Sequence, residues 1–182
     1  MTTYISLLRG VNVGGQNKID MQALRSLYAA LGLADVRSYV QSGNVLFASA
    51  EQESSLLARR IEARVERSFG AAVTVFVRTP DDFRRILAAN PFLKRNEDPT
   101  RLHVTFLSTP LPTVKLGLLA GAATAGDEFS PGEAEIYLFC PNGYGRTKLS
   151  NAFFERKLGL AATTRNWNTV TTLYNLAVEG MK

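Results

Sequence analysis

The order of helices and strands expected along this chain most constrains its fold, because the same order occurs twice. In the first half, apolar spacing and turn residues predict a strand, a helix, two strands joined by a hairpin, a second helix and a fourth strand. A short final helix follows. These elements are expected at residues 3–9, about 20–31, 35–40, 44–49, about 52–69, 73–78 and 80–89.

Apolar residues at three-and-four spacing carry the two longer helices of this half. The helix over about 20–31 has Asp20 as its expected N-cap and Gly32 as its expected C-cap. The helix over about 52–69 repeats an apolar residue at every fourth position, while apolar residues alternate along strand 73–78. We therefore expect a core that contains Leu57, Ile61, Val65, Val75 and Val77.

The second half repeats the βαββαβ order and again ends in a helix. Its elements are expected at 102–108, about 112–123, a hairpin turning at 130–133, 134–140, about 149–158, 161–165 and 166–178. A βαββαβ unit with right-handed crossovers forms an antiparallel sheet in the order 4-1-3-2 with helices on one face. The fold class is thus α+β: two ferredoxin-like plait subdomains packed together, over 1–90 and 101–182, with 91–100 as the linker.

This topology predicts which polar loops meet. In the first half, strand one ends at the edge where the hairpin turns, so the Arg9–Lys18 loop should lie beside Ser42, Gly43 and Asn44. In the second half, strands three and four end at a common edge, which should bring the loop at 141–148 next to the segment at 165–168. Each half is therefore expected to hold one cluster of polar residues and glycines.

Composition narrows the classes of protein. Only one cysteine, Cys140, is present, so no internal disulfide can form, and the chain fits a reducing cytoplasm. Only one histidine, His103, is present, which argues against a zinc site of the common type. The N-terminal apolar run is too short for a signal peptide, and nothing approaches a membrane span. We expect no metal, no cofactor and no membrane partner.

Charge is distributed unevenly along the chain, whose net charge is +5. Residues 1–96 carry 13 basic and 8 acidic side chains, residues 97–140 carry 2 and 6, and residues 141–182 carry 6 and 2. A basic balance favours phosphorylated ligands or nucleic acid. Because the charge is dispersed rather than gathered in one run, a mildly basic protein without such a partner is the competing interpretation.

Two long motifs resemble a known family. The first comprises Leu8-Arg9-Gly10-Val11-Asn12-Val13-Gly14-Gly15, Ile19-Asp20-Met21 and Tyr39-Val40-Gln41-Ser42-Gly43-Asn44-Val45. The second comprises Thr147-Lys148-Leu149, Asn151, Glu155 and the run from Ala162 to Val170. Together they resemble the signatures of a bacterial family known as domain of unknown function 1697, over essentially the whole chain. The resemblance implies two plait-like subdomains and assigns no activity.

The glycine loop of the first motif has two interpretations. Gly14 and Gly15 lie between a strand and a helix, where backbone N–H groups can hold a phosphate, with Lys18 adding charge. The spacing matches neither GxGxxG nor GxxxxGK[ST], so no nucleotide fingerprint is present. Alternatively, these glycines only provide positive φ in a turn.

The second motif is equally open. Asn166 could cap the final helix, and Arg165 would then stand beside a helix end that favours an anion, or pair with Glu155. Trp167 lies on the apolar stripe of that helix and is expected in the core. The loop at 141–148 could contact nucleic acid through Tyr144 and its cations, or be an ordinary solvated connection.

A thiolate–imidazole pair is the remaining catalytic possibility, because strand order brings Cys140 near His103. No residue is seen to orient the imidazole, and cysteine is commonly a small buried apolar residue, which is the favoured interpretation.

The function that follows is a non-catalytic module that binds an anionic ligand, either a phosphorylated metabolite or nucleic acid, in a basic cleft between the subdomains. The alternative is an enzyme acting on a phosphorylated or carboxylated small molecule, with Lys148, Glu155 and Arg165 in acid–base and electrostatic roles. The sequence leaves the oligomeric state open. The expected ligand-binding residues are Arg9, Asn12, Gly14, Gly15, Lys18, Ser42, Asn44, Lys148, Asn151, Arg165, Asn166 and Asn168.

Overall fold

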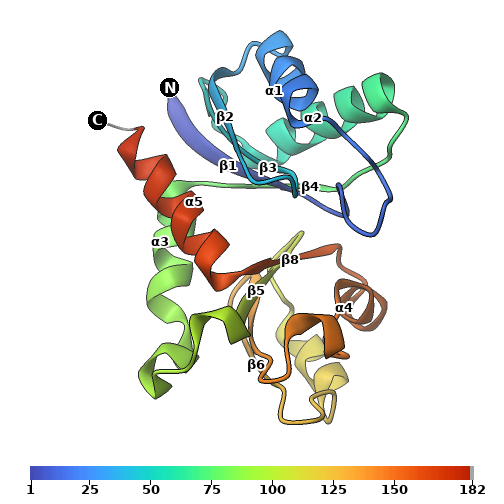
Figure 1. Cartoon of the computed structure of the whole chain (residues 1–182), viewed down its shortest axis with the longest axis vertical. Coiled ribbons are helices and arrows are strands. Elements are labelled where there is room, and N and C mark those ends of the chain that lie inside the picture. Colours follow the sequence, from blue (N-terminus) through green and yellow to red (C-terminus); the bar gives the residue numbers. More distant parts are fainter. Residues whose placement is uncertain (181–182) are drawn as a thin grey trace. The chain divides into compact units, whose positions relative to one another are not determined.

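Two four-stranded antiparallel sheets form the framework of the protein, as a computed structural model describing residues 1–180 shows (Figure 1). The first sheet has the order β2 (Ala34–Tyr39), β3 (Asn44–Ser49), β1 (Thr2–Leu8) and β4 (Val75–Arg78). The second has the order β6 (Glu128–Pro131), β7 (Glu135–Phe139), β5 (Leu102–Leu107) and β8 (Ala162–Asn166). Both are the plait order, which confirms the predicted fold class.

Helices α1 (Met21–Ala30) and α2 (Ser54–Phe69) pack on one face of the first sheet. The Asp20 carboxylate accepts a hydrogen bond from the Ala23 N–H at 2.8 Å, so the predicted N-cap of α1 is confirmed. The five residues expected in this core are all at most 4% exposed, which confirms the predicted apolar faces of α2 and β4.

The second sheet carries α4 (Asn151–Leu158) on one face, together with the 3₁₀ helix η3 (Thr113–Leu119). The prediction of an α-helix over about 112–123 is therefore wrong. Gly117 interrupts the segment, and no side chain caps its first turn, so only a short 3₁₀ helix forms. The Lys115 ammonium group donates to the Leu158 carbonyl oxygen and joins this segment to the end of α4.

The other face of the second sheet is also covered, by residues that follow the first plait. These belong to α3 (Pro80–Ala89) and the 3₁₀ helix η1 (Pro91–Arg95). The Tyr137 hydroxyl donates to the Ile86 carbonyl oxygen at 3.1 Å, and the rings of Phe92 and Phe139 lie 6.2 Å apart. RNA-recognition motifs bind RNA by stacking bases on this face of the plait. Because α3 and η1 cover that face of the second sheet, bases cannot stack there.

The chain divides into two compact units, Met1–Arg84 with Leu173–Lys182, and Arg85–Thr172. The divisions fall inside α3 and inside the last helix, α5 (Trp167–Glu179). The segment expected as a linker contains η1 and a second 3₁₀ turn, η2 (Pro99–Arg101), and its Phe92 is buried. The division into subdomains 1–90 and 101–182 with a linker at 91–100 stays a prediction.

Trp167 at the start of α5 is 7% exposed, as expected for a core residue. Among residues 1–180, no helix is both long and apolar enough to cross a bilayer.

Candidate functional site

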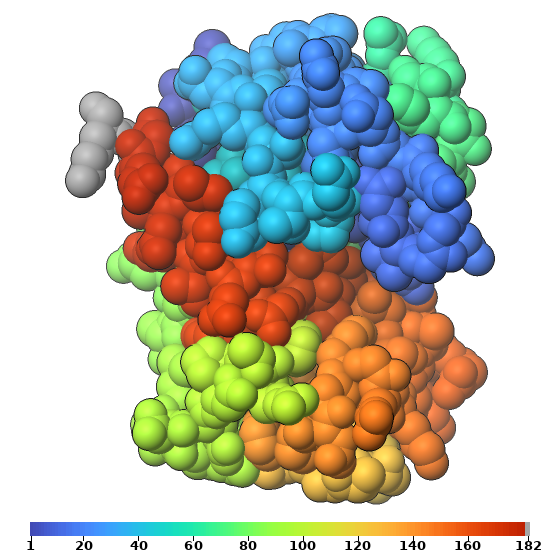
Figure 2. Space-filling view, in the orientation of Figure 1, coloured from blue at the N-terminus to red at the C-terminus, as the bar shows by residue number. Residues whose placement is uncertain are grey.

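The first polar segment, the loop after β1, folds into a small ordered hairpin. Val13 and Gln16 pair as an antiparallel bridge, and the Gln16 N–H donates to the Val13 carbonyl oxygen at 3.1 Å. Gly14 and Gly15 between them have φ of +60° and +78°, the left-handed values required at both central positions of a type I′ turn. Both glycines are exposed, and Figure 2 shows this part of the chain (blue) at the surface. This geometry matches the interpretation of Gly14 and Gly15 as turn glycines. Anion binding by their backbone N–H groups stays a prediction.

Asn12 fixes this hairpin to its surroundings. Its side-chain nitrogen donates to the carbonyl oxygens of Ile19 at 2.9 Å and Gln41 at 2.8 Å, while its side-chain oxygen accepts from the Ile19 N–H at 2.8 Å. The loop thus lies beside the β2–β3 turn, where strand order placed it. Because these bonds engage both ends of the amide, Asn12 holds the loop rather than presenting its amide to a ligand.

The β2–β3 turn is fixed in the same way. The buried Asn44 side chain donates to the Tyr39 carbonyl oxygen at 3.1 Å and to the Ser42 hydroxyl at 2.9 Å. The Leu8 N–H donates to the Gly43 carbonyl oxygen at 2.9 Å and ties the turn to the end of β1. Asn44 and Ser42 therefore shape the turn from inside.

The two cations of this loop differ in their surroundings. Arg9 is half-buried, and its backbone N–H donates to the Thr74 carbonyl oxygen at 2.9 Å. Lys18 is exposed and forms neither a hydrogen bond nor an ion pair within residues 1–180. Lys18 is thus the group of this loop most available to a ligand.

The second polar segment begins where β7 ends and reaches the start of β5. The Tyr144 ring stacks on the His103 ring with centroids 4.9 Å apart and planes at 27°. The Thr147 hydroxyl donates to the Asp127 carboxylate, and the Asn142 amide donates to the Ala125 carbonyl oxygen at 2.9 Å. The loop is therefore ordered by its own contacts, whereas Lys148 within it is exposed.

Arg165 on β8 is 9% exposed, and its guanidinium donates to the Thr163 hydroxyl at 2.8 Å and the Thr164 carbonyl oxygen at 3.0 Å. Burial lowers the pKa of Arg165 to about 10, because desolvation disfavours its charged form, and nearby Tyr144 opposes this shift. Tyr144 stacks on His103, and His103 pairs with Asn166 across the sheet, so the loop at 141–148 lies beside the segment at 165–168, as the strand order predicted. Arg165 remains charged at neutral pH.

The amides of this segment also serve the fold. Asn151 accepts a hydrogen bond from the Thr164 hydroxyl at 2.7 Å. The Asn166 side-chain oxygen accepts from the Asn168 N–H at 2.9 Å, which is the expected capping contact of α5, and its nitrogen donates to the Thr100 carbonyl oxygen at 3.2 Å. Asn168 itself is exposed. As in the first segment, most amides are engaged within the protein.

Burial shifts both members of the possible Cys140–His103 pair away from an ionised pair. It raises the pKa of the Cys140 thiol to about 11, with the Asp127 carboxylate adding to the shift. Burial also lowers the pKa of His103 below 6.5, partly offset by the Arg101 backbone. A thiolate–imidazolium pair needs the opposite shifts, so the geometry favours a buried structural cysteine.

We expect acid to destabilise the fold through His103. Below a pH of about 6.5 His103 of the unfolded chain becomes protonated, whereas the buried imidazole of the folded protein stays neutral until a lower pH. The free energy of unfolding therefore falls as the pH drops from about 6.5 through the folded pKa. Urea unfolding at about pH 7.5 and pH 5 measures the loss, and His103→Gln should reduce it. Since the chain has one histidine, its NMR titration is unambiguous. A folded pKa at or above 6.5 would contradict the assignment.

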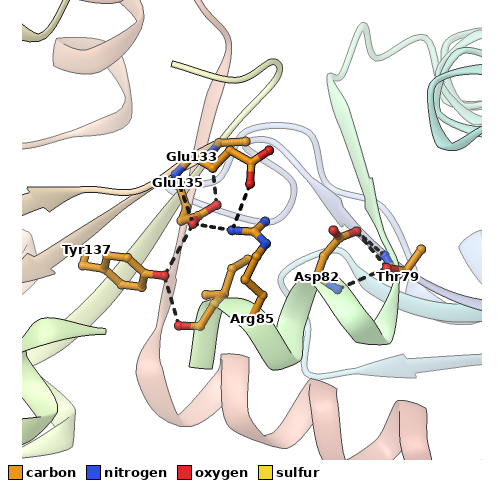
Figure 3. Close-up of polar contacts among 8 residues, drawn as sticks. Thr79, Asp82, Arg85, Glu133, Glu135 and Tyr137 are labelled. Atoms are coloured by element: carbon orange, nitrogen blue, oxygen red, sulfur yellow. Dashed lines mark hydrogen bonds and ion pairs between the residues drawn. The ribbon is translucent and has the colours of Figure 1, made fainter. Parts of the chain in front are cut away.

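A buried carboxylate in the second unit was not anticipated (Figure 3). Glu135 on β7 is 2% exposed and accepts from the Arg85 guanidinium at 2.8 Å, the Ala134 N–H at 3.2 Å and the Tyr137 hydroxyl at 3.4 Å. Arg85 also lies 3.7 Å from Glu133. A charged residue at the start of the otherwise apolar strand Glu135–Phe139 was the available sequence signal. The contacts compensate the buried charge and indicate a structural role.

The sequence also did not indicate two hollows in the first unit, of about 500 and 400 Å³. Both are lined by Thr3, Asp35, Ala48 and Gly180, none of which belongs to either polar motif. The left-handed φ of Asp35, +50°, marks the place where the pairing of β2 with β3 shifts register. No residue pattern signals such a position in advance.

Comparisons with known proteins agree with the fold. A family model described as a protein of unknown function, DUF1697, matches residues 1–137. The structure of the conserved bacterial protein SP0830 from Streptococcus pneumoniae is similar, with a TM-score of 0.75 and 26% identity, and the match covers 97% of this chain and 98% of that one. A search of curated proteins found no match.

Proposed function

We propose that this chain, which belongs to the DUF1697 family of proteins of unknown function, is a non-catalytic module that binds an anionic ligand. The single observation that carries the proposal is how each polar loop uses its side chains. The side-chain amides of the loops hydrogen-bond to backbone groups, as at Asn12, Asn44 and Asn166. By contrast, Lys18 and Lys148 are exposed. The loops are held in shape while Lys18 and Lys148 face solvent.

The charge of these loops supports an anionic ligand. Neither 9–19 nor 141–151 contains an acidic residue. Within the described part of the chain, the side chains of Lys18, Arg146 and Lys148 form no ion pair or hydrogen bond. Cations that are not engaged in ion pairs, on loops held in shape, are suited to phosphate groups, because little reorganisation opposes binding. A phosphorylated metabolite and nucleic acid both fit this chemistry.

The proposal predicts that anions stabilise the fold. A ligand at a hundredfold excess over its dissociation constant should add about 2.7 kcal/mol to the free energy of unfolding. Thermal unfolding with inorganic phosphate, nucleotides, sugar phosphates and short oligonucleotides measures this. Loss of a charge-assisted hydrogen bond costs about 1.5–3 kcal/mol, so Lys18→Gln or Lys148→Gln should weaken binding roughly tenfold or more.

Lys94→Gln and Lys157→Gln are matched controls, since both lysines are exposed and unpaired within residues 1–180. They should leave affinity nearly unchanged. If no anion shifts the unfolding transition, or if the controls weaken binding as much as the loop variants, the loops are not the site. The expectation that both loops share one cleft stays a prediction.

A further inference from the structure

Helix α2 carries a stripe of arginines that neither polar loop includes. Arg60, Arg64 and Arg67 stand at positions i, i+4 and i+7, and therefore share one side of the helix. Glu62 and Glu66 lie on a different side, and the Glu62 carboxylate is occupied by the Val75 N–H at 2.8 Å. Cations and carboxylates of α2 are thus segregated.

The three arginines line a single hollow of about 250 Å³, together with Leu31 and Ala63. Arg60 is positioned by a hydrogen bond from its guanidinium to the Leu31 carbonyl oxygen at 3.1 Å. The Nε atom of Arg64 is buried and has no hydrogen-bond partner in the described residues. The surface of the hollow is almost entirely apolar, formed by Leu31, Ala63 and the carbon stems of the three arginines.

No carboxylate lies within ion-pair distance of these three guanidinium groups in residues 1–180. The contrast is Arg59 on the same helix, which lies 3.7 Å from the Glu53 carboxylate. Like charges at i and i+4 repel and destabilise a helix, and a buried N–H without a partner adds to that cost. An anion bound at the stripe would offset the repulsion between these charges.

From this geometry we propose that the arginine stripe, Arg60, Arg64 and Arg67, binds the phosphate backbone of nucleic acid. Arginine presents a planar fork of donors that matches phosphate oxygens, and a row of such forks along one helix suits a chain of phosphates. The apolar wall at Leu31 and the arginine stems can receive a base or sugar beside them. This site shares no residue with the proposed loop site and does not depend on the role of Lys18 or Lys148.

The test is the binding of a fluorescent oligonucleotide to the full chain, single-stranded and duplex, followed by anisotropy over about 50–200 mM salt. Arg64→Gln/Arg67→Gln removes two phosphate contacts. It should weaken binding about tenfold or more and lower the log–log salt slope by about 1.4 for a single strand. Arg59→Gln/Arg84→Gln is the matched control, because these exposed arginines lie near Glu53 and Asp81.

The control variant should bind the oligonucleotide as tightly as the unmodified protein. The stripe variant should unfold at the same or a higher temperature, because the repulsion between like charges is relieved. Lys18→Gln/Lys148→Gln should retain oligonucleotide binding at the stripe, so failure of the proposed loop site is separable from failure here. Three results would overturn the proposal: no oligonucleotide binding, equal losses in stripe and control variants, or equally tight binding of poly-glutamate.

Discussion

Gly43→Ala should destabilise the protein by about 3 kcal/mol. Gly43 has φ of +75°, and holding an alanine there costs roughly 1–2 kcal/mol. An added Cβ would stand 2.9 Å from the Leu8 Cβ and 3.2 Å from the Val11 Cβ. Both neighbours are fully buried, so they cannot move aside cheaply, and such overpacking costs about 1–3 kcal/mol more. Urea unfolding measures the loss.

The control is Gly14→Ala. Gly14 also has a left-handed φ, +60°, but an added Cβ would have no atom within 4 Å. Only the backbone cost of about 1–2 kcal/mol then applies. Equal losses in the two variants would show that the turn does not press against β1 as closely as the structure indicates.

Ile61→Ala should cost about 2–5 kcal/mol, because it leaves a cavity in the core of the first unit. Ile61 is fully buried between Leu57 and Val65 on the apolar side of α2. Val13→Ala is the control, since Val13 is 61% exposed, and we expect a change within about 0.5 kcal/mol. A loss below about 0.5 kcal/mol for Ile61→Ala would mean that α2 packs by another side.

Periodicity explains why the first half was the more predictable part of the fold. The helix expected over about 52–69 is Ser54–Phe69, because apolar residues repeat at every fourth position and Gly70 ends it. The helix expected over about 112–123 is a 3₁₀ turn instead. That segment is apolar on nearly all sides and contains Gly117 and Gly121. Its composition alone therefore did not distinguish an α-helix from the 3₁₀ helix that forms.

For the candidate site, strand order was sufficient to predict which loops meet, because the ends of paired strands are fixed by topology. The contact from Asn12 to Gln41 confirms that juxtaposition in the first unit. Which side chains remain for a ligand could not be predicted. Asn12, Asn44 and Asn166 have the same chemistry as ligand-binding amides, and only three-dimensional geometry shows that backbone groups occupy them.

The arginine stripe was open to prediction from spacing alone, since Arg60, Arg64 and Arg67 follow the same period as the apolar residues between them. The sequence could not reveal that Glu62 is occupied by a strand amide, or that Leu31 closes the hollow.

The most direct test of the proposed function is an NMR titration of the full chain with adenosine triphosphate, and then with an oligonucleotide of about 12 nucleotides. If the loops bind an anion, one of these ligands shifts the backbone amides of Gly14, Gly15, Lys18 and Lys148, and Lys18→Gln/Lys148→Gln suppresses those shifts. Shifts confined to the hollow lined by Thr3, Asp35 and Ala48, or shifts unchanged in the double variant, would contradict anion binding by the loops.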